Sequence, residues 1–296
     1  MRIDILTIFP NLLASPLEEG IIRRAVRDGK VEIVLHDIRA FATDRHAMTD
    51  DRPFGGGEGM VMKPEPIAAA LEAVAAAAGR GWVVLLSPQG RRYSQAKAAE
   101  LAGRQHLVMI CGRYEGVDHR IASAFVDEEI SIGDYILTGG ELAAMVLVDS
   151  VVRLLPGALG CAASASRETF TCGLLKHPQY TRPQVFRGLA VPEVLLSGDH
   201  GRIADWRLVA AVRRTLELRP DLLALVRFSR DQWRLLRRQG LVAECRARGV
   251  DLLPPEDAAA SGGEACHGDR SGAPAPSGLQ PAWPSGDLGD HQPGSP

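Results

Sequence analysis

Hydrophobic residues up to position 155 follow two spacings, one typical of strands and one typical of helices. Short apolar runs predict strands over residues 2–8, 31–38, 82–87, 107–111 and 128–132. Apolar residues at helical spacing predict helices over residues 17–28, 64–78, 94–103 and 141–155. Because strands and helices alternate, we expect an α/β fold with a mostly parallel sheet and helices on both faces.

Residues that start and stop helices support these limits. Gly29 lies where the first helix should end, and Pro64 lies where the second should begin, at a position where its missing N–H does no harm. Ser94 is a typical N-cap. Residues 39–62 show no clear period and contain Phe54-Gly-Gly-Gly57, so we expect a long loop of the kind that serves a function.

The second half of the chain has a different pattern. From residue 160 to about 183 the chain is small, polar and aperiodic, as expected of a linker. Residues 191–249 predict helices only, over 192–196, 201–218, 220–225 and 229–248. Beyond Pro254 almost no large apolar residue occurs, so the chain cannot bury enough surface to offset its ordering entropy, and we expect a disordered tail.

Charge is divided unevenly along the chain. The formal net charge of all 296 residues is only −2. Residues 201–250 hold twelve arginines and five acidic residues, a net charge of +7, whereas residues 251–296 hold seven acidic residues and one arginine, a net charge of −6. A basic helical domain suits binding to a phosphate backbone, and solvated helix faces with a general arginine bias are the alternative explanation.

Cysteine content and hydropathy favour a soluble cytoplasmic protein. The five cysteines include no C-x-x-C pair, which argues against a disulfide framework and a structural zinc site. The apolar segment at the start stops at Pro10 and is too short for a signal peptide. No run of about eighteen apolar residues is present to span a membrane.

Three loops with glycine or proline follow predicted strands, at residues 88–90, 112–116 and 133–140. In an open α/β sheet, ligands bind at the carboxyl ends of the strands, where main-chain groups are unsatisfied. Glycine allows a positive φ and the close approach of a ligand. Each loop alone is explained equally well as a tight turn. Together they predict a nucleoside-sized pocket built chiefly from main chain.

Several common motifs are absent. The sequence has no G-x-x-x-x-G-K-[ST], no G-x-G-x-x-G and no H-E-x-x-H, so P-loop, dinucleotide-binding and zinc-protease functions lose their main support. Two other classes stay open. One is a nucleic-acid-binding protein that holds a nucleoside without catalysis. The other is a nucleotidyltransferase-like α/β enzyme, which the missing P-loop and metal carboxylate cluster disfavour.

The same loops carry a family resemblance. Ser87-Pro-Gln-Gly90, residues 111–118 (CGRYEGVD) and residues 131–142 (SIGDYILTGGEL) closely resemble motifs of the bacterial tRNA (guanine-N1)-methyltransferases, the TrmD family. Further matches lie at 54–57, 156–160, 173–175, 180–183, 194–198 and 200, so the resemblance runs from residue 1 to about residue 248.

The resemblance implies a domain organisation and an assembly. It implies a knotted SPOUT α/β domain at 1–160 that binds the methyl donor, an inter-domain linker at 161–183 and a small all-helical tRNA-binding domain at 184–250. A disordered acidic tail at 251–296 follows. It also implies a homodimer in which the pocket loops of one subunit face the linker and helical domain of the other. A monomer whose linker folds back on its own sheet is the alternative.

The resemblance further implies transfer of a methyl group from S-adenosylmethionine to N1 of guanosine at position 37 of tRNA. It assigns the methyl-donor pocket to Leu86, Ser87, Pro88, Gly112, Tyr114, Glu115, Gly116, Ile132, Gly133, Asp134, Tyr135, Ile136, Leu137, Gly139 and Gly140. Main-chain amides would bind the adenine and ribose, and Tyr135, Ile136 and Leu137 would supply apolar walls. Magnesium dependence is a feature of the family, so Mg²⁺ is a candidate cofactor, although no carboxylate cluster identifies a site.

Two residues are implied in catalysis. Guanine N1 holds its proton at neutral pH and must lose it to attack the methyl group, so a carboxylate base is needed. Glu168 stands where the family has an aspartate before Ser-Phe, and we expect it to be that base; without the resemblance it would be interpreted as a solvated linker residue. Arg153 matches the family arginine that holds guanine O6. As a cation at a helix C-terminus it also interacts favourably with the helix dipole.

Two positions depart from the family pattern. Lys176 stands where the family usually has an acidic residue, so a second acidic helper is missing there. Glu58 stands where the family more often has a small residue or proline, which affects the 50–59 loop expected near the tRNA.

Overall fold

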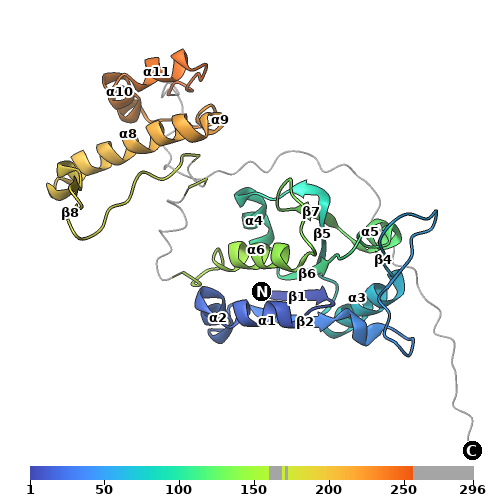
Figure 1. The fold of residues 1–296 in the computed structure, drawn as a ribbon. Coiled ribbons are helices and arrows are strands. Elements are labelled where there is room, and N and C mark those ends of the chain that lie inside the picture. Colours follow the sequence, from blue (N-terminus) through green and yellow to red (C-terminus); the bar gives the residue numbers. More distant parts are fainter. Residues whose placement is uncertain (160–168, 171–172, 256–296) are drawn as a thin grey trace, which may run out of the picture. The chain divides into compact units, whose positions relative to one another are not determined.

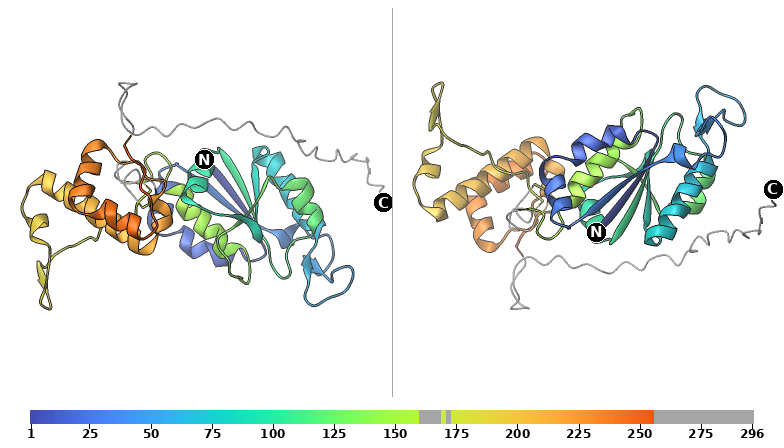
Figure 2. Two further views of the ribbon diagram at one scale, coloured as in Figure 1. Left: turned by 90° about the horizontal axis from the view of Figure 1, so that it is seen from above. Right: turned by 90° about the horizontal axis from the view of Figure 1, so that it is seen from below.

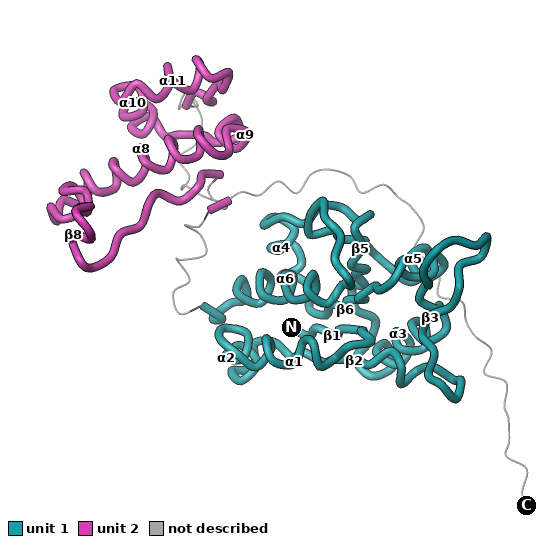
Figure 3. The backbone as a smooth tube through the Cα atoms, viewed as in Figure 1, with its two compact units in different colours: residues 1–160, 274–296 teal, residues 161–273 magenta. Residues whose placement is uncertain are grey.

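The computed structural model describes residues 1–159, 169–170 and 173–255 of the chain. These residues form two compact units, the first up to residue 159 and the second from residue 169 onward (Figure 3). The tail that we predict to be disordered lies outside the described residues beyond position 255, as does the linker segment 161–168.

Five parallel strands form the centre of the first unit (Figure 1). They are β1 (Arg2–Thr7), β2 (Glu32–Asp37), β5 (Trp82–Arg92), β6 (His106–Cys111) and β7 (Glu128–Ser131), in the spatial order β2-β1-β6-β5-β7. Continuous apolar runs such as Leu107–Cys111 suit strands that are covered on both faces. The predicted α/β class with a parallel sheet is confirmed.

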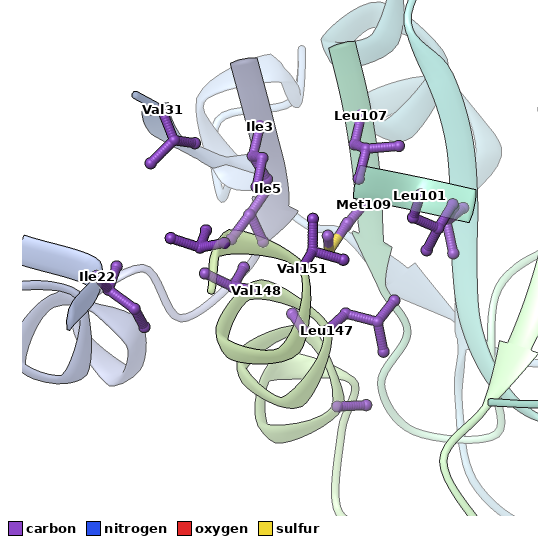
Figure 4. Packing of buried hydrophobic residues seen from close by; sticks show 14 of the residues in the cluster. Ile3, Ile5, Ile22, Val31, Leu101, Leu107, Met109, Leu147, Val148 and Val151 are labelled. Carbon is purple, nitrogen blue, oxygen red and sulfur yellow. The ribbon is translucent and has the colours of Figure 1, made fainter. Parts of the chain in front are cut away.

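Helices cover both faces of the sheet (Figure 2). One face packs against α1 (Asn11–Leu17), α2 (Gly20–Arg27), α4 (Gln95–Ala102) and α6 (Glu141–Val152), and the other against α3 (Pro64–Ala78) and α5 (His119–Phe125). On the first face, Val148 and Val151 of α6 lie close to Ile5 of β1 and Met109 of β6 (Figure 4). Because side chains of a strand alternate, β1 contributes to both cores.

Local signals placed some helix limits correctly and missed two helices. The helix α3 begins at Pro64, and Ser94 caps α4 by accepting a hydrogen bond from Lys97 N. The helices α1 and α5 were not predicted, since each has only seven residues. Helices this short are marginally stable alone and depend on tertiary packing. Seven residues are also only about two turns, too few to show a clear helical spacing of apolar residues.

The strand β5 continues past Ser87, where the predicted strand ended. Its pairing with β7 shifts register between Leu86 and Arg91, so residues 87–90 form a bulge within the strand. Gly90 is required there because a Cβ would overlap the main chain of Ile130. The long loop before α3 contains a 3₁₀ helix, η1 (Ile38–Phe41), and two short antiparallel strands, β3 (Asp50–Asp51) and β4 (Val61–Met62).

The second unit is mainly helical. A hairpin that was not predicted, β8 (Val185–Phe186) and β9 (Leu189–Ala190), precedes η2 (Glu193–Leu196), α8 (His200–Leu218), α9 (Pro220–Leu223), α10 (Arg230–Arg238) and α11 (Leu241–Ala247). The prediction of one last helix over 229–248 was wrong, because Gly240 adopts a left-handed φ of 74° between α10 and α11. None of the helices described in either unit is long and apolar enough to cross a membrane.

Candidate functional site

A cavity of about 240 Å³ lies at the carboxyl ends of β6 and β7 and beside the bulge within β5. Its walls are the bulge of β5, the loop 112–117 after β6 and the loop 132–140 after β7. Every residue predicted for the methyl-donor pocket lines this cavity except Asp134. The loops after β6 and β7 meet here because parallel strands end at the same edge of the sheet, and the bulge of β5 reaches the cavity because β5 pairs with both strands.

The loop 112–117 is held by β4. Glu115 N donates to Met60 O at 2.9 Å, and Met62 N donates to Gly116 O at 2.9 Å. Tyr114 adopts a φ of 58°, which is uncommon for a residue other than glycine, and its side chain is half exposed. These main-chain bonds fix the shape of the loop independently of any ligand.

Glycines bring the loops after β6 and β7 into contact. Gly140 N donates to Gly112 O at 2.9 Å. A Cβ on Gly140 would lie 2.8 Å from Cys111 Cα, and a Cβ on Gly139 would overlap the Arg113 side chain. Gly140 is therefore required by the contact between the loops, and a Cβ at position 139 would displace the Arg113 side chain. The sequence suggested a positive φ or the approach of a ligand as the reasons for glycine.

A buried carboxylate supports this contact from behind. Glu141, the first residue of α6, has no solvent exposure. Its carboxylate accepts from Arg113 Nε at 3.0 Å and from Thr7 Oγ1 at 2.7 Å. Arg113 Nη1 in turn donates to Thr138 O at 3.1 Å. Charge-assisted hydrogen bonds thus join α6, the end of β1 and both cavity loops.

Phe9 packs against the flat face of the Arg113 side chain. The Arg113 guanidinium carbon lies 4.5 Å from the ring centroid of Phe9, and that of Arg39 lies 5.0 Å from it. Phe9 N donates to Thr7 Oγ1 at 2.9 Å, the hydroxyl that also bonds to Glu141. Arg113 is therefore restricted by a carboxylate at its head and by a cation–π contact on its face.

The loop after β7 presents apolar side chains. Ser131 Oγ accepts from Gly133 N at 3.3 Å, and Tyr135 and Ile136 are 54% and 81% exposed. The Asp134 carboxylate forms an exposed ion pair with Arg92 at 2.9 Å and does not line the cavity. Main-chain groups next to exposed apolar side chains suit a ligand with a planar ring and polar edges.

Of the two predicted catalytic residues, only Arg153 lies among the described residues. Glu168 lies outside the described residues. Arg153 is half-buried at the C-cap of α6, where its N–H donates to Asp149 O at 3.3 Å, and it does not line the cavity. Lys176, in the second unit, is exposed, and its N–H donates to Thr169 Oγ1 at 3.2 Å.

Neither a metal site nor a reactive thiol is found in the described parts of the chain. No group of three or more His, Cys, Asp or Glu side chains among the described residues is placed to hold a metal ion, so Mg²⁺ has no ligand set there. Burial raises the pKa of the Cys111 thiol well above its ordinary value, which keeps the thiol protonated at neutral pH.

The side chains that hold the cavity together were not predicted to have a role. Arg113, Thr138 and Glu141 all lie inside the family motifs at residues 111–118 and 131–142. Glu141 was a usable signal, because it begins a helix whose apolar sequence predicts burial. A charged residue that is fully buried almost always has a partner, so a cation such as Arg113 could be expected nearby. Gln89, in the bulge of β5, and His119, the first residue of α5, also line the cavity, and no sequence signal marks His119.

The fold and the cavity define a parallel α/β protein with a loop-lined cavity at the carboxyl edge of its sheet. Comparison with known proteins identifies the family. Residues 1–225 match the family model of the tRNA (guanine-1)-methyltransferase TrmD. The chain therefore belongs to the TrmD family of tRNA (guanine-N1)-methyltransferases, and the resemblance found in the sequence is confirmed.

Individual relatives agree with the family match. The chain is 54% identical to the tRNA (guanine-N(1)-)-methyltransferase of Geobacter sulfurreducens over 243 residues, which are 81% of this chain and 99% of the relative. It is 57% identical to the enzyme of the same name from Geobacillus kaustophilus over 223 residues, which are 75% of this chain and 91% of that relative.

Proposed function

We propose that this chain transfers a methyl group from S-adenosylmethionine to N1 of the guanosine at position 37 of tRNA. One observation carries the proposal: in a member of this enzyme family, the three loops predicted to hold the methyl donor line one cavity at the carboxyl edge of the sheet. The specific position on tRNA and the roles of individual residues are the parts of the proposal that go beyond family membership.

The described residues fit the methyl donor. Main-chain groups of the loops 112–116 and 132–140 bind its adenine and ribose, and Tyr135 and Ile136 pack against its apolar parts. The bond from Gly140 N to Gly112 O and the buried pair of Glu141 and Arg113 keep this cavity in shape before binding, which lowers the cost of ordering on binding. The bound donor supplies an electrophilic methyl group.

Glu168 acts as the general base that takes the proton from guanine N1, and Arg153 stabilises the negative charge that develops on O6. Both roles come from matching positions of the family motif. Arg153 lies at the end of α6 opposite to Glu141, about 18 Å along the helix, so its role rests on the family motif alone. Mg²⁺ is given no step, since no group of three or more His, Cys, Asp or Glu side chains among the described residues marks a site for it.

The second unit binds tRNA. Its helix α8 buries Val212 and Leu216 on one side and leaves Arg213 and Arg214 exposed. Exposed arginines on a rigid helix suit contacts to phosphates. The domain limits 1–160, 161–183 and 184–250 and the knotted chain path belong to the same proposal, and the division of the described residues into two units supports the first limit.

A homodimer completes the active site. Leu142 and Val146, one turn apart on α6, are 56% and 44% exposed, and Ile136 at the cavity is 81% exposed. Exposed apolar side chains next to a functional cavity support an interface with a second copy of the chain. The linker and helical domain of one subunit would then supply Glu168 and the tRNA to the cavity of the other.

A methyl-transfer assay tests the activity. The protein is incubated with methyl-labelled S-adenosylmethionine and an unmodified tRNA that carries guanosine at position 37, and the matched control is the same tRNA with adenosine at that position. We expect label only in the first tRNA, at guanine N1. Binding of tRNA without any labelled product would instead favour a non-catalytic RNA-binding protein.

Substitution of the proposed base tests the catalytic role. Glu168→Gln keeps the shape of the side chain and removes the base, so turnover should fall by about 10²–10⁴-fold while the Kd values for donor and tRNA stay unchanged. Glu168→Asp, which restores the family residue, is the matched control and should stay active. Wild-type turnover in Glu168→Gln would show that the base lies elsewhere.

Mixed dimers test whether sites are shared. Gly140→Ala is chosen to damage the cavity, because its Cβ would lie 2.8 Å from Cys111 Cα, whereas a Cβ on Gly112 would meet nothing closer than 3.5 Å. Homodimers of Glu168→Gln should be inactive, and homodimers of Gly140→Ala should be strongly impaired when the donor concentration is kept below their weakened Kd. Mixed dimers should regain part of the activity if one site receives intact copies of both elements, and no recovery in verified mixed dimers would mean that each site is built within one chain.

A further inference from the structure

A second cavity, of about 340 Å³, lies entirely within the second unit. The segment 177–184, at the end of the predicted linker and directly before the hairpin, forms one wall. Val191, Leu195 and Leu196 form an apolar wall, and Arg207 of α8 completes the lining. The predicted methyl-donor pocket shares no residue with it, so the proposed reaction leaves this cavity without a role.

Three aromatic rings gather at this cavity. The ring centroids of His177 and Tyr180 each lie 6.2 Å from that of Trp206, with interplanar angles of 68° and 57°. Trp206 is half-buried on α8 and braces the other two rings, whereas Tyr180 is 48% exposed and lines the cavity. A braced and exposed ring is a platform on which another planar ring can stack.

The charged groups of the cavity are all cationic. Arg182 and Arg207 line it and are exposed, and no acidic residue of the described chain does so. Neither guanidinium has an ion-pair partner in the described part of the chain. Other arginines of this unit do, such as Arg234, which pairs with Asp231 at 3.0 Å. Two cations without a local counter-charge suit an anionic ligand, and the amide of Gln179 adds hydrogen-bonding capacity beside them.

We propose that this cavity binds one unpaired nucleotide of the tRNA anticodon loop other than the guanosine that is methylated. The base stacks on Tyr180, and the flanking phosphates lie against Arg182 and Arg207. Stacking on an aromatic side chain combined with arginine–phosphate contacts is how proteins hold single-stranded RNA. The inference rests on the proposed function, because it takes tRNA as the substrate. It adds a second contact that would hold the anticodon loop of the tRNA in place.

Fluorescence of the RNA tests the stacking. The probe is an anticodon stem-loop RNA with guanosine at position 37, in which one loop nucleotide at a time is replaced by 2-aminopurine, whose fluorescence falls on stacking. It is titrated with the full chain without methyl donor. At one position we expect a quench that persists with Tyr180→Phe and is lost with Tyr180→Leu, with an affinity loss of about tenfold.

Phe186→Leu is the matched control, because Phe186 is an exposed aromatic residue of the same unit, at 59% exposure, that does not line the cavity. This variant should keep the quench. Thermal unfolding of each variant checks that the unit is folded, and Tyr180→Phe separates loss of the ring from loss of the hydroxyl.

Salt dependence tests the phosphate contact independently. Arg207→Ala should reduce the slope of log K against log salt concentration by about 0.7 for each single-strand phosphate released. Arg234→Ala, which removes an arginine already paired with Asp231, should change the slope less. Equal slopes for the two variants would overturn the phosphate contact.

The outcomes separate this inference from the proposed function. If the chain methylates tRNA but no loop position shows quenching that depends on Tyr180, the inference is wrong and the proposed function stands. If Tyr180→Leu changes the subunit stoichiometry and leaves the quench intact, the cavity is covered by a second chain and the inference is wrong. Absence of both methylation and RNA binding would overturn both.

Discussion

Two carboxylates of the first unit, Asp4 and Glu141, have no solvent exposure. They differ in the parts of the unit that their hydrogen bonds connect. Asp4 accepts hydrogen bonds from Arg2 at 2.7 Å, from His36 at 2.6 Å and from His106 at 2.8 Å, all of them on strands of the sheet. Glu141 accepts from Arg113, which belongs to a cavity loop, and from Thr7 at the end of β1.

The difference shows that the partners of a buried charge, and not its burial, decide what it does. Burial by itself would raise the pKa of Asp4, but hydrogen bonds from His36, Arg2 and His106 outweigh this and hold the pKa well below its ordinary value. None of these residues lines the cavity. Asp4 therefore stabilises β1, β2 and β6 against one another, whereas Glu141 positions the loops that line the cavity.

The largest effect is expected from Asp4→Asn. The substitution leaves Arg2 and two histidines around a neutral amide, and removal of one partner of a buried ionic group costs about 3–5 kcal/mol. Urea unfolding of the full chain measures the loss. The matched control is Asp28→Asn in the exposed pair with Arg27, which should cost less than about 1 kcal/mol.

If Asp4 stabilises only the strands, Asp4→Asn should leave the Kd for S-adenosylmethionine unchanged at a temperature where the variant is folded. A large change in that Kd without loss of stability would show that the two carboxylates are not functionally distinct.

The next effect is expected from Glu141→Gln. The amide keeps the size of the side chain but removes the charge that holds Arg113, and a hydrogen bond to a charged group contributes about 1.5–3 kcal/mol. We expect the Kd for S-adenosylmethionine, measured by calorimetry, to rise by about tenfold or more, because each 1.4 kcal/mol is tenfold in affinity. Stability should fall less than in Asp4→Asn; an equal fall with unchanged Kd would make Glu141 a purely structural residue.

The contact between the loops is tested by a pair of glycine variants. Gly140→Ala forces its Cβ against the main chain of β6, and such overpacking costs about 1–3 kcal/mol, which should appear as weakened binding of the methyl donor. Gly112→Ala places its Cβ 3.5 Å from Leu86 O, an ordinary contact, and should bind the donor nearly as wild type. If Gly112→Ala were the more damaging of the two, ligand approach would be the reason for that glycine.

The smallest effect is expected at Asp118, the N-cap of α5. Hydrogen bonds from the Arg120 side chain lower the pKa of Asp118 to about 2. Because the folded-state pKa lies below the unfolded one, the stabilisation is fully present above about pH 4 and is lost as the pH falls toward 2. The difference in unfolding free energy between wild type and Asp118→Asn should be below about 1 kcal/mol at pH 7 and shrink in acid; a difference that grew in acid would contradict this sign.

Local sequence signals predicted the fold where one short segment decides the structure. Pro64 fixed the start of α3, Ser94 fixed the cap of α4, and alternating strand and helix patterns gave the parallel sheet. The prediction failed at α1, at α5 and at Gly240, where packing or one backbone angle decides and neighbouring residues carry little information.

The candidate site was also predicted only where short segments decide its structure. Loops after parallel strands must meet at one edge, so the sequence placed the cavity-lining residues, with Asp134 as the exception. It gave no role to Arg113 or Glu141, because their pairing joins positions 28 residues apart and depends on how α6 packs on the sheet.

The family, the parallel sheet and the three segments of the predicted methyl-donor pocket could be predicted from the amino-acid sequence. They depend on hydrophobic period, on glycine positions and on long motifs, all of which are properties of contiguous residues. The roles of Glu141 at a cavity loop and of Asp4 between strands became evident only in the folded chain, as did the second cavity that Tyr180 and Arg207 share. Those roles follow from contacts between distant residues, and the free energy of such contacts is set by burial and geometry that no single segment specifies.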